Sequence, residues 1–166
     1  MTHRITASRR GPERVLACRA TVDQPGSTRS YGRATRPCTR LAGRDLLTFT
    51  GPAFCRLHGP VTQEDASPVE ACLPFAAAAA QPGDLPDGMV VLDLPGTLYA
   101  STVVDGAAAA FPDILAAYDA VASWITTHAF DFAGPVHEIY RRWCGEPGHP
   151  DNRLEIAWPI TEPDGP

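Results

Sequence analysis

The chain has 166 residues, of which 44% are hydrophobic and 20% are charged, as is typical of one folded globular domain with a core of its own. Its net charge of -5 argues against a protein that grips duplex DNA or RNA, which usually carries a basic surplus, so no nucleic-acid partner is expected. No apolar run approaches the roughly 20 residues of a membrane span, and no apolar segment of a secretory signal follows the basic start, so we expect a cytoplasmic protein without membrane contact.

The first half of the chain begins with a basic segment, residues 1–11, which we expect to be a disordered tail. A strand is predicted at 14–21 and a second at 69–75, where β-branched and apolar residues dominate. Residues 33–47 are the best candidate for a helix between them, although Pro37 and Gly43 weaken it. Two prolines and two glycines at 82–88 predict a linker to the second half.

The second half shows its elements more clearly. Residues 97–104 are rich in Thr, Val and Tyr and end at an Asp-Gly pair, which predicts a strand followed by a turn. Residues 111–128 predict a helix, because Pro112 suits a first turn and apolar residues recur on one face. Further strands are predicted after Gly134 and at 154–160, and residues 161–166 are expected to be a frayed tail.

An internal repeat organises these elements. Segments 51–75 and 134–160 each open with Gly-Pro, run into a strand-like stretch, cross a polar loop and close on apolar-Glu-x-x-apolar-Pro-apolar. Their spacing is close to half the chain. The repeat predicts an α+β fold of two tandem duplicated strand-helix-strand-strand units, with repeat halves 12–80 and 89–160, that form a pseudo-twofold antiparallel sheet with helices on one face.

Strand alternation identifies candidate site residues. In 154–160 and 69–75 the larger apolar residues share one face, so Glu155 and Glu70 point to the uncovered face, as ligand contacts or as solvated carboxylates. Glu138 shares a face with Tyr140, and its repeat partner is Cys55. A carboxylate beside an aromatic ring in a concave site can hold a cation or, if desolvated, act as a general acid or base.

Two more aromatic residues are weaker candidates. Tyr99 lies in the strand that leads to Asp105, and Trp143 enters the loop after the Glu138 strand. Either could stack on a planar ligand or serve only in packing. The candidate ligand-binding set is therefore Glu138, Tyr140, Tyr99, Trp143, Glu70, Glu155 and Cys55.

The remaining motifs exclude several chemistries. The five cysteines include no C-x-x-C pair and are expected to be reduced thiols. His137, Cys144 and His149 lack the ligand spacing of a zinc site, and no nucleotide-binding or hydrolase nucleophile motif occurs. Neither a metal nor a cofactor is expected.

With these residues in place, the chain resembles the GyrI-like superfamily, which includes the effector-binding domains of AraC- and MerR-type transcription activators. The Gly-Pro…Glu-x-Tyr segment at 134–140 and the Glu-Ile-x-Trp-Pro segment at 155–159 carry the resemblance most specifically. The resemblance implies a ligand cleft along the pseudo-twofold axis, in which Glu138 binds cationic or aromatic compounds. Because no DNA-binding segment precedes residue 14, we expect a stand-alone member.

Three functions follow as hypotheses. The first is a small-molecule-binding protein for an aromatic or cationic drug or natural product, serving drug sequestration or resistance. The second is a cofactor-independent hydrolase that opens the cyclopropane of electrophilic DNA-alkylating natural products, with Glu138 as its catalytic residue. The third, again implied by the resemblance, is an interaction protein that modulates DNA gyrase or a regulator.

Overall fold

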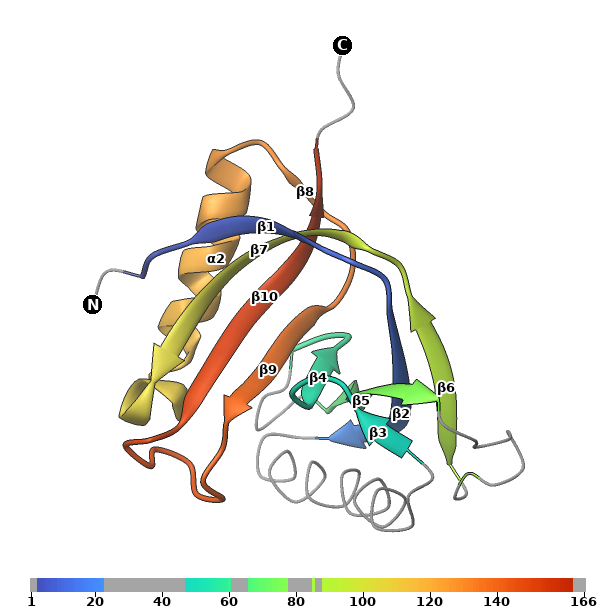
Figure 1. Ribbon diagram of the computed structural model, residues 1–166. Coiled ribbons are helices and arrows are strands. Elements are labelled where there is room, and N and C mark those ends of the chain that lie inside the picture. Colours follow the sequence, from blue (N-terminus) through green and yellow to red (C-terminus); the bar gives the residue numbers. More distant parts are fainter. Residues whose placement is uncertain (1–2, 23–46, 61–65, 78–84, 86–87, 163–166) are drawn as a thin grey trace. The chain divides into compact units, whose positions relative to one another are not determined.

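The computed structural model describes residues 3–22, 47–60, 66–77, 85 and 88–162 (Figure 1). The chain divides into two compact units, one made of residues 12–95 and the other of residues 1–11 together with 96–166. Within the described ranges, no helix has both the length and the apolar character that crossing a membrane requires.

The unit of residues 12–95 is built on an antiparallel sheet. Its strands are β2 (Glu13–Val22), β3 (Leu47–Phe49), β4 (Phe54–Leu57), β5 (Ser67–Ala77) and β6 (Met89–Leu94). Strand β5 pairs with β2, β3 and β4, and β2 pairs with β6 on its other side. The buried side chains of Leu16, Leu73, Phe75 and Met89 form its core, as the alternation in 69–75 predicts.

The sequence predictions for this unit were partly right. Strands at 14–21 and 69–75 are confirmed as parts of β2 and β5. The candidate helix at 33–47 lies outside the described residues except for Leu47, which is extended and pairs with Ala77 as the first residue of β3. No strand was predicted at the start of the expected second repeat half, 89–160, yet residues 89–94 form β6, whose backbone pairs with β2.

The second unit is a sheet with a helix on one face. Its elements are β1 (Thr6–Arg10), β7 (Thr97–Asp105), the 3₁₀ turn η2 (Gly106–Ala109), α2 (Leu115–Thr127), β8 (Asp131–Phe132), β9 (Val136–Arg142) and β10 (Arg153–Thr161). Neighbouring strands are antiparallel in the order β1, β7, β10, β9, and β8 pairs with the end of β10. Helix α2 packs on β7 and β10 (Figure 1). This confirms the expected α+β class, with antiparallel strands and a helix on one face.

The N-terminal segment corrects one prediction. Residues 1–11 were expected to be a disordered basic tail, yet Thr6–Arg10 form edge strand β1 against β7. The basic composition of this segment suggested a tail. An edge strand is held by backbone hydrogen bonds, which do not require apolar side chains. Ile5 also packs on the core of this unit, and Arg10 is held by Glu155.

The helix begins later than expected. Residues 111–114 form turns, and the amides of Leu115, Ala116 and Ala117 bond to carbonyls three residues earlier. The spacing becomes α-helical at Tyr118, whose amide bonds to the carbonyl of Ile114. From there the apolar face is as predicted, since Val121 and Ile125 pack with Ala100 and Ile160 in the core.

The two faces of this sheet differ in character. Trp158 and Ile160 of β10 face the helix and belong to its core. Glu155 and Tyr99 alternate with those positions and so lie on the face that α2 does not cover. Candidate site residues are found on both faces, and the sheet separates them.

Candidate functional site

Glu138 is the centre of the site on the helix side of the second unit. In the β9–β10 register it lies opposite Ile156, and Tyr140 lies opposite Leu154, so both point toward the face that α2 covers. The Tyr118 hydroxyl, from α2, donates a hydrogen bond to Oε1 of Glu138. The Tyr140 hydroxyl donates to Oε2 at 3.0 Å. One carboxylate thus accepts from two phenols that belong to different elements.

The surroundings of Glu138 favour its protonated form. Burial raises the pKa of its carboxyl, and the hydrogen bonds from Tyr118 and Tyr140 lower it by less, so the pKa lies above its ordinary value. The side chain is nevertheless only half-buried, so part of it stays accessible. A carboxyl group that is costly to ionise and still reachable is suited to binding a cation or to transferring a proton.

Four aromatic side chains surround this carboxylate. Trp158 of β10 lies edge-on to Tyr118, with ring centroids 5.7 Å apart. Trp143, just after β9, lies edge-on to Tyr140 at 5.5 Å. Both tyrosine hydroxyls bond to Glu138, so the two ring pairs flank a single carboxylate. Such rings offer negative faces to a cation and apolar area to a planar ligand.

Glu155 occupies the opposite face of the same sheet. Its carboxylate accepts hydrogen bonds from Arg10 at 2.6 Å and from Nε and Nη2 of Arg141 at 2.8 and 2.5 Å. Only 5% of its side chain is exposed, so this is a buried charge neutralised by two guanidinium groups. It is not the solvated carboxylate that was one of its two sequence interpretations.

A polar hollow of about 680 Å³ surrounds this ion-pair cluster. It is lined by Arg4, Thr6, Ser8, Arg10, Ser101, Thr102, Val103, Arg141, Arg153 and Glu155. Tyr99 lies on this face, with the Arg10 guanidinium carbon 4.5 Å from its ring centre and the His137 ring at 5.3 Å. The sheet therefore separates Tyr99 from Glu138, with which the sequence analysis grouped it.

Glu70 in the unit of residues 12–95 repeats the pattern of Glu155. It accepts hydrogen bonds from Arg19 at 2.6 Å and Arg56 at 2.7 Å, and His58 Nε2 lies 2.9 Å away. Burial would raise the pKa of Glu70, but the bond from His58, the charge of Arg56 and the bond from Arg19 outweigh it, so the pKa lies below its ordinary value. Cys55 directly precedes Arg56 in β4. It is buried and lies opposite Ala71 of β5.

The structure therefore divides the predicted residues into three places. Glu138, Tyr140 and Trp143 lie together on the helix side of β9. Tyr99 and Glu155 lie on the other side of that sheet, and Glu70 and Cys55 belong to the other unit.

Sequence reasoning missed two members of the Glu138 site, Tyr118 and Trp158. Both were assigned to the apolar core; Trp158 does pack against it, whereas Tyr118 is half-buried at its margin. The overlooked signal was chemical, because a tyrosine on the apolar face of a helix needs an acceptor for its hydroxyl, and Glu138 is a buried acceptor.

Three of the strand glutamates, Glu70, Glu138 and Glu155, differ in their partners. Glu70 and Glu155 are each bound by two arginines. Among the described residues, no Arg or His side chain pairs with Glu138, and its hydrogen-bond donors are neutral phenols. In that part of the chain, one group could hold a metal ion, Cys144, His149 and Asp151 in the loop after β9.

Comparison with known proteins identifies the fold. No protein-family model and no curated protein matches the chain by sequence. The solved C-terminal domain of EcmrR does match in structure, with a TM-score of 0.78 and 17% identity over 98% of this chain and 99% of that domain. The chain has the GyrI-like fold. This agrees with the α+β fold that the sequence resemblance implies.

Other solved structures share the GyrI-like fold at low identity. A longer EcmrR chain in a complex with DNA matches with a TM-score of 0.77 and 15% identity, over 96% of this chain and 58% of that one, so this chain spans little more than half of that protein. SAV2435 bound to tetraphenylphosphonium matches at 0.58 and 13%, over 97% and 94%. A hydrolase from Listeria innocua matches at 0.63 and 10%, over 95% and 91%.

Proposed function

We propose that this GyrI-like domain binds a cationic aromatic small molecule at Glu138, in the service of drug sequestration or resistance. The observation that carries the proposal is that Glu138 differs in its partners from Glu70 and Glu155. Glu70 and Glu155 already have guanidinium partners, whereas Glu138 is held only by phenol hydroxyls among the described residues. In the described part of the chain, no cationic side chain pairs with this carboxylate.

The energetics favour a ligand that is both cationic and apolar. Desolvation makes the free carboxylate of Glu138 costly, so a bound positive charge stabilises the ionised form and lowers its pKa. Tyr140 and Trp143 on one side, and Tyr118 and Trp158 on the other, supply apolar area and cation–π attraction. A delocalised cation is weakly hydrated, so it loses little on entering such surroundings. The tetraphenylphosphonium complex of SAV2435, which shares the fold, supports this ligand class.

A titration with tetraphenylphosphonium tests the proposal. Calorimetry at neutral pH should show saturable binding to the natural chain, and Glu138→Gln should weaken it by about tenfold or more, because a desolvated charge pair is lost while shape is kept. The matched control is Glu162→Gln, which removes the charge of an exposed glutamate. Equal affinity of the Glu138→Gln variant and the natural chain would show that the carboxylate does not recognise the cation.

Hydrolysis of an electrophilic natural product is the second candidate. The raised pKa of Glu138 favours it, because burial makes this carboxyl group hold its proton more tightly than an ordinary glutamate, as a general acid requires. The hydrolase from Listeria innocua with the same fold keeps this alternative open. The test is mass spectrometry of a cyclopropane-bearing alkylator incubated with substoichiometric protein. A water adduct that accumulates over many equivalents and disappears in Glu138→Gln supports catalysis, whereas unchanged compound supports binding alone.

We also infer that the two units are copies of one ancestral unit. In each, a short strand pairs with the strand that follows it, and an arginine of the first binds a glutamate of the second 14 residues later. In the strand register Cys55 lies opposite Ala71 as Glu138 lies opposite Ile156, and this register, not the 14-residue arginine spacing, relates Cys55 to Glu138. One copy thus carries a thiol where the other carries the carboxylate. The ligand cleft and the gyrase partner expected from the sequence stay predictions.

A further inference from the structure

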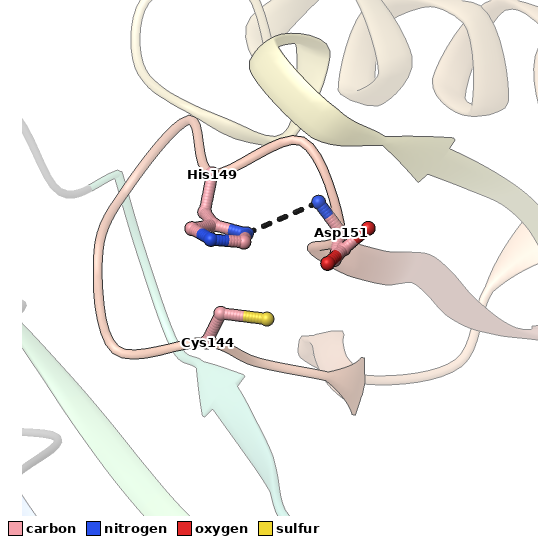
Figure 2. Close-up of side chains that lie close together, drawn as sticks. All are labelled: Cys144, His149 and Asp151. Carbon is pink, nitrogen blue, oxygen red and sulfur yellow. Dashed lines mark hydrogen bonds between the residues drawn. The ribbon is translucent and has the colours of Figure 1, made fainter.

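The loop between β9 and β10 brings together three side chains that the Glu138 site does not use. The Cys144 thiol, a ring nitrogen of His149 and a carboxylate oxygen of Asp151 all lie within 4.8 Å of one another. Figure 2 shows the three side chains facing a common space inside the loop, with Cys144 on one arm and His149 and Asp151 on the other. Cys144 and Asp151 are exposed and His149 is half-buried, so a small solute can reach them.

A buried asparagine fixes the shape of this loop. Asn152 is 1% exposed; its side-chain oxygen accepts from the Cys144 amide at 2.8 Å, and its side-chain amide donates to the Glu146 carbonyl at 2.7 Å. Its backbone amide bonds to the His149 carbonyl at 3.0 Å, and its own carbonyl accepts from the Gly106 amide at 2.8 Å. The two arms of the loop are therefore tied together from inside, whether or not a solute is bound.

Two glycines allow the chain to turn within this frame. Gly145 and Gly148 have φ values of 90° and 75°, in the left-handed region that favours glycine. They flank Glu146 and let the chain reverse between Cys144 and His149. The convergence of the three side chains is thus a property of the backbone and does not depend on contacts among the side chains.

We propose that Cys144, His149 and Asp151 bind a Zn²⁺ ion. Thiolate, imidazole and carboxylate are the three ligand types that zinc takes in proteins, and this combination of one soft and two harder donors suits zinc better than calcium or magnesium, which take oxygen ligands. Ligand atoms around a tetrahedral zinc lie closer together than 4.8 Å, so small side-chain rotations bring them into range. Three protein ligands leave a fourth position for water or for a ligand from solution.

The hydrogen bonding of His149 is compatible with metal binding. Its Nδ1 accepts a bond from the Asp151 backbone amide at 3.2 Å, at the long end of the normal range, so this nitrogen carries a lone pair and is weakly engaged. Zinc would take that lone pair in place of the amide, and the Cys144 thiol would lose its proton on binding, so zinc uptake should release protons. His137, a possible ligand in the sequence prediction together with Cys144 and His149, lies tilted against Tyr99, with ring centroids 5.3 Å apart, and has no part in the group.

The test is zinc and cobalt titration of the tag-free, reduced, full-length chain. We expect one Zn²⁺ per chain, with proton release, and a thiolate-to-cobalt absorption band when Co²⁺ is used as the probe. Cys144→Ser, His149→Asn and Asp151→Asn should each weaken Zn²⁺ binding by more than about tenfold, since losing a ligand costs at least as much as losing an outer contact. Cys144→Ser should also abolish the cobalt band.

Matched controls are available in the same chain. Cys18→Ser changes a free thiol outside the loop, and His128→Asn changes an exposed imidazole, so neither should alter zinc affinity more than about twofold. The ligand variants should fold, because the Cys144 side chain is exposed and the loop uses its backbone amide. Thermal unfolding without metal checks this.

Absence of saturable Zn²⁺ binding, or unchanged binding and cobalt absorption in Cys144→Ser, would overturn the proposal. Because the readout is metal binding, its failure is separate from a failure to bind organic cations.

Discussion

The Tyr118 hydroxyl of α2 donates a hydrogen bond to the Glu138 carboxylate of β9. This bond ties the helix to the strand that carries the charge, and a second phenol, Tyr140, donates to the other oxygen of the same carboxylate. Stability and the proposed ligand binding therefore depend on one group, so changes at the phenols should affect both.

Replacing Tyr118 with Phe removes one donor and keeps the ring against Trp158. We expect a loss of about 1–2 kcal/mol in the free energy of unfolding, typical of a hydrogen bond to a charged or partly charged acceptor. The pKa of Glu138 should rise further, because one of the two bonds that lower it is gone. The pH at which tetraphenylphosphonium begins to bind should therefore shift upward. Tyr99→Phe, on the opposite face of the sheet, is the control that should leave this pH unchanged.

The raised pKa of Glu138 predicts the direction in which the free energy of unfolding changes with pH. The folded chain holds this proton more tightly than the unfolded chain does, so the contribution of Glu138 to stability falls as pH rises from about 4.3, the ordinary value, through the raised folded pKa. The Glu138→Gln variant has no carboxyl group to ionise at this position, so it does not lose stability in this way as pH rises. The stability of the variant relative to the natural chain should therefore increase across that window and then level off. Urea unfolding at several pH values measures it, and a flat difference would show that the carboxyl titrates normally.

Glu70 should behave with the opposite sign. Its pKa is lowered in the folded chain, so the stability that it contributes is present above about 4.3 and is lost as pH falls through the folded pKa. Glu70→Gln leaves Arg56 and His58 without their charged partner and should cost about 2–3 kcal/mol at neutral pH. The cost should shrink below pH 4, which urea unfolding in acid would reveal. An equal cost at every pH would mean that packing, and not charge, is what the substitution removes.

The scaffold of the β9–β10 loop can be tested without metal. Asn152→Ala deletes the side-chain bonds to Cys144 and Glu146 inside a buried space, and we expect it to cost about 2–3 kcal/mol. The comparison is Asp151→Asn, an exposed neighbour whose substitution should cost less than about 0.5 kcal/mol. Thermal unfolding with a chelator present separates this effect from any stabilisation by zinc.

A feature of the fold or of the candidate site could be predicted from the sequence where it depends on residues close together in the chain. Strand alternation correctly placed Trp158 and Ile160 toward the helix and Glu155 away from it, because a period of two is a local property of the chain. The arginine partners of Glu155 could not be foreseen, since Arg10 lies 145 residues away in the chain. The same limit hid the bond from Tyr118 to Glu138.

The zinc-ligand group shows a different limit. Sequence reasoning weighed Cys144 and His149 together with His137, found no common ligand spacing and predicted no metal; it did not consider Asp151. Their proximity depends on Asn152, a single buried polar residue that closes the loop from inside. A polar residue just before an apolar strand is ordinary in sequence, and only its burial shows what it does.

The last prediction concerns strand β1, whose composition resembles that of a loose tail. Arg10 and Arg9 are neighbours with the same side chain, but Arg10 is 29% exposed and bonds to the buried Glu155 at 2.6 Å. Arg9 is 74% exposed and lies 3.8 Å from Glu162, itself 72% exposed. Arg10→Ala should cost about 1–2 kcal/mol, because Arg141 is then the one arginine left to Glu155 within the described ranges, whereas Arg9→Ala should cost less than about 0.5 kcal/mol. Urea unfolding of the two variants measures the difference.

Equally small losses would mean that β1 contributes nothing in solution and that the sequence interpretation of residues 1–11 as a tail was correct. A loss confined to Arg10→Ala would show that the start of the chain is part of the sheet and that one buried glutamate holds it there.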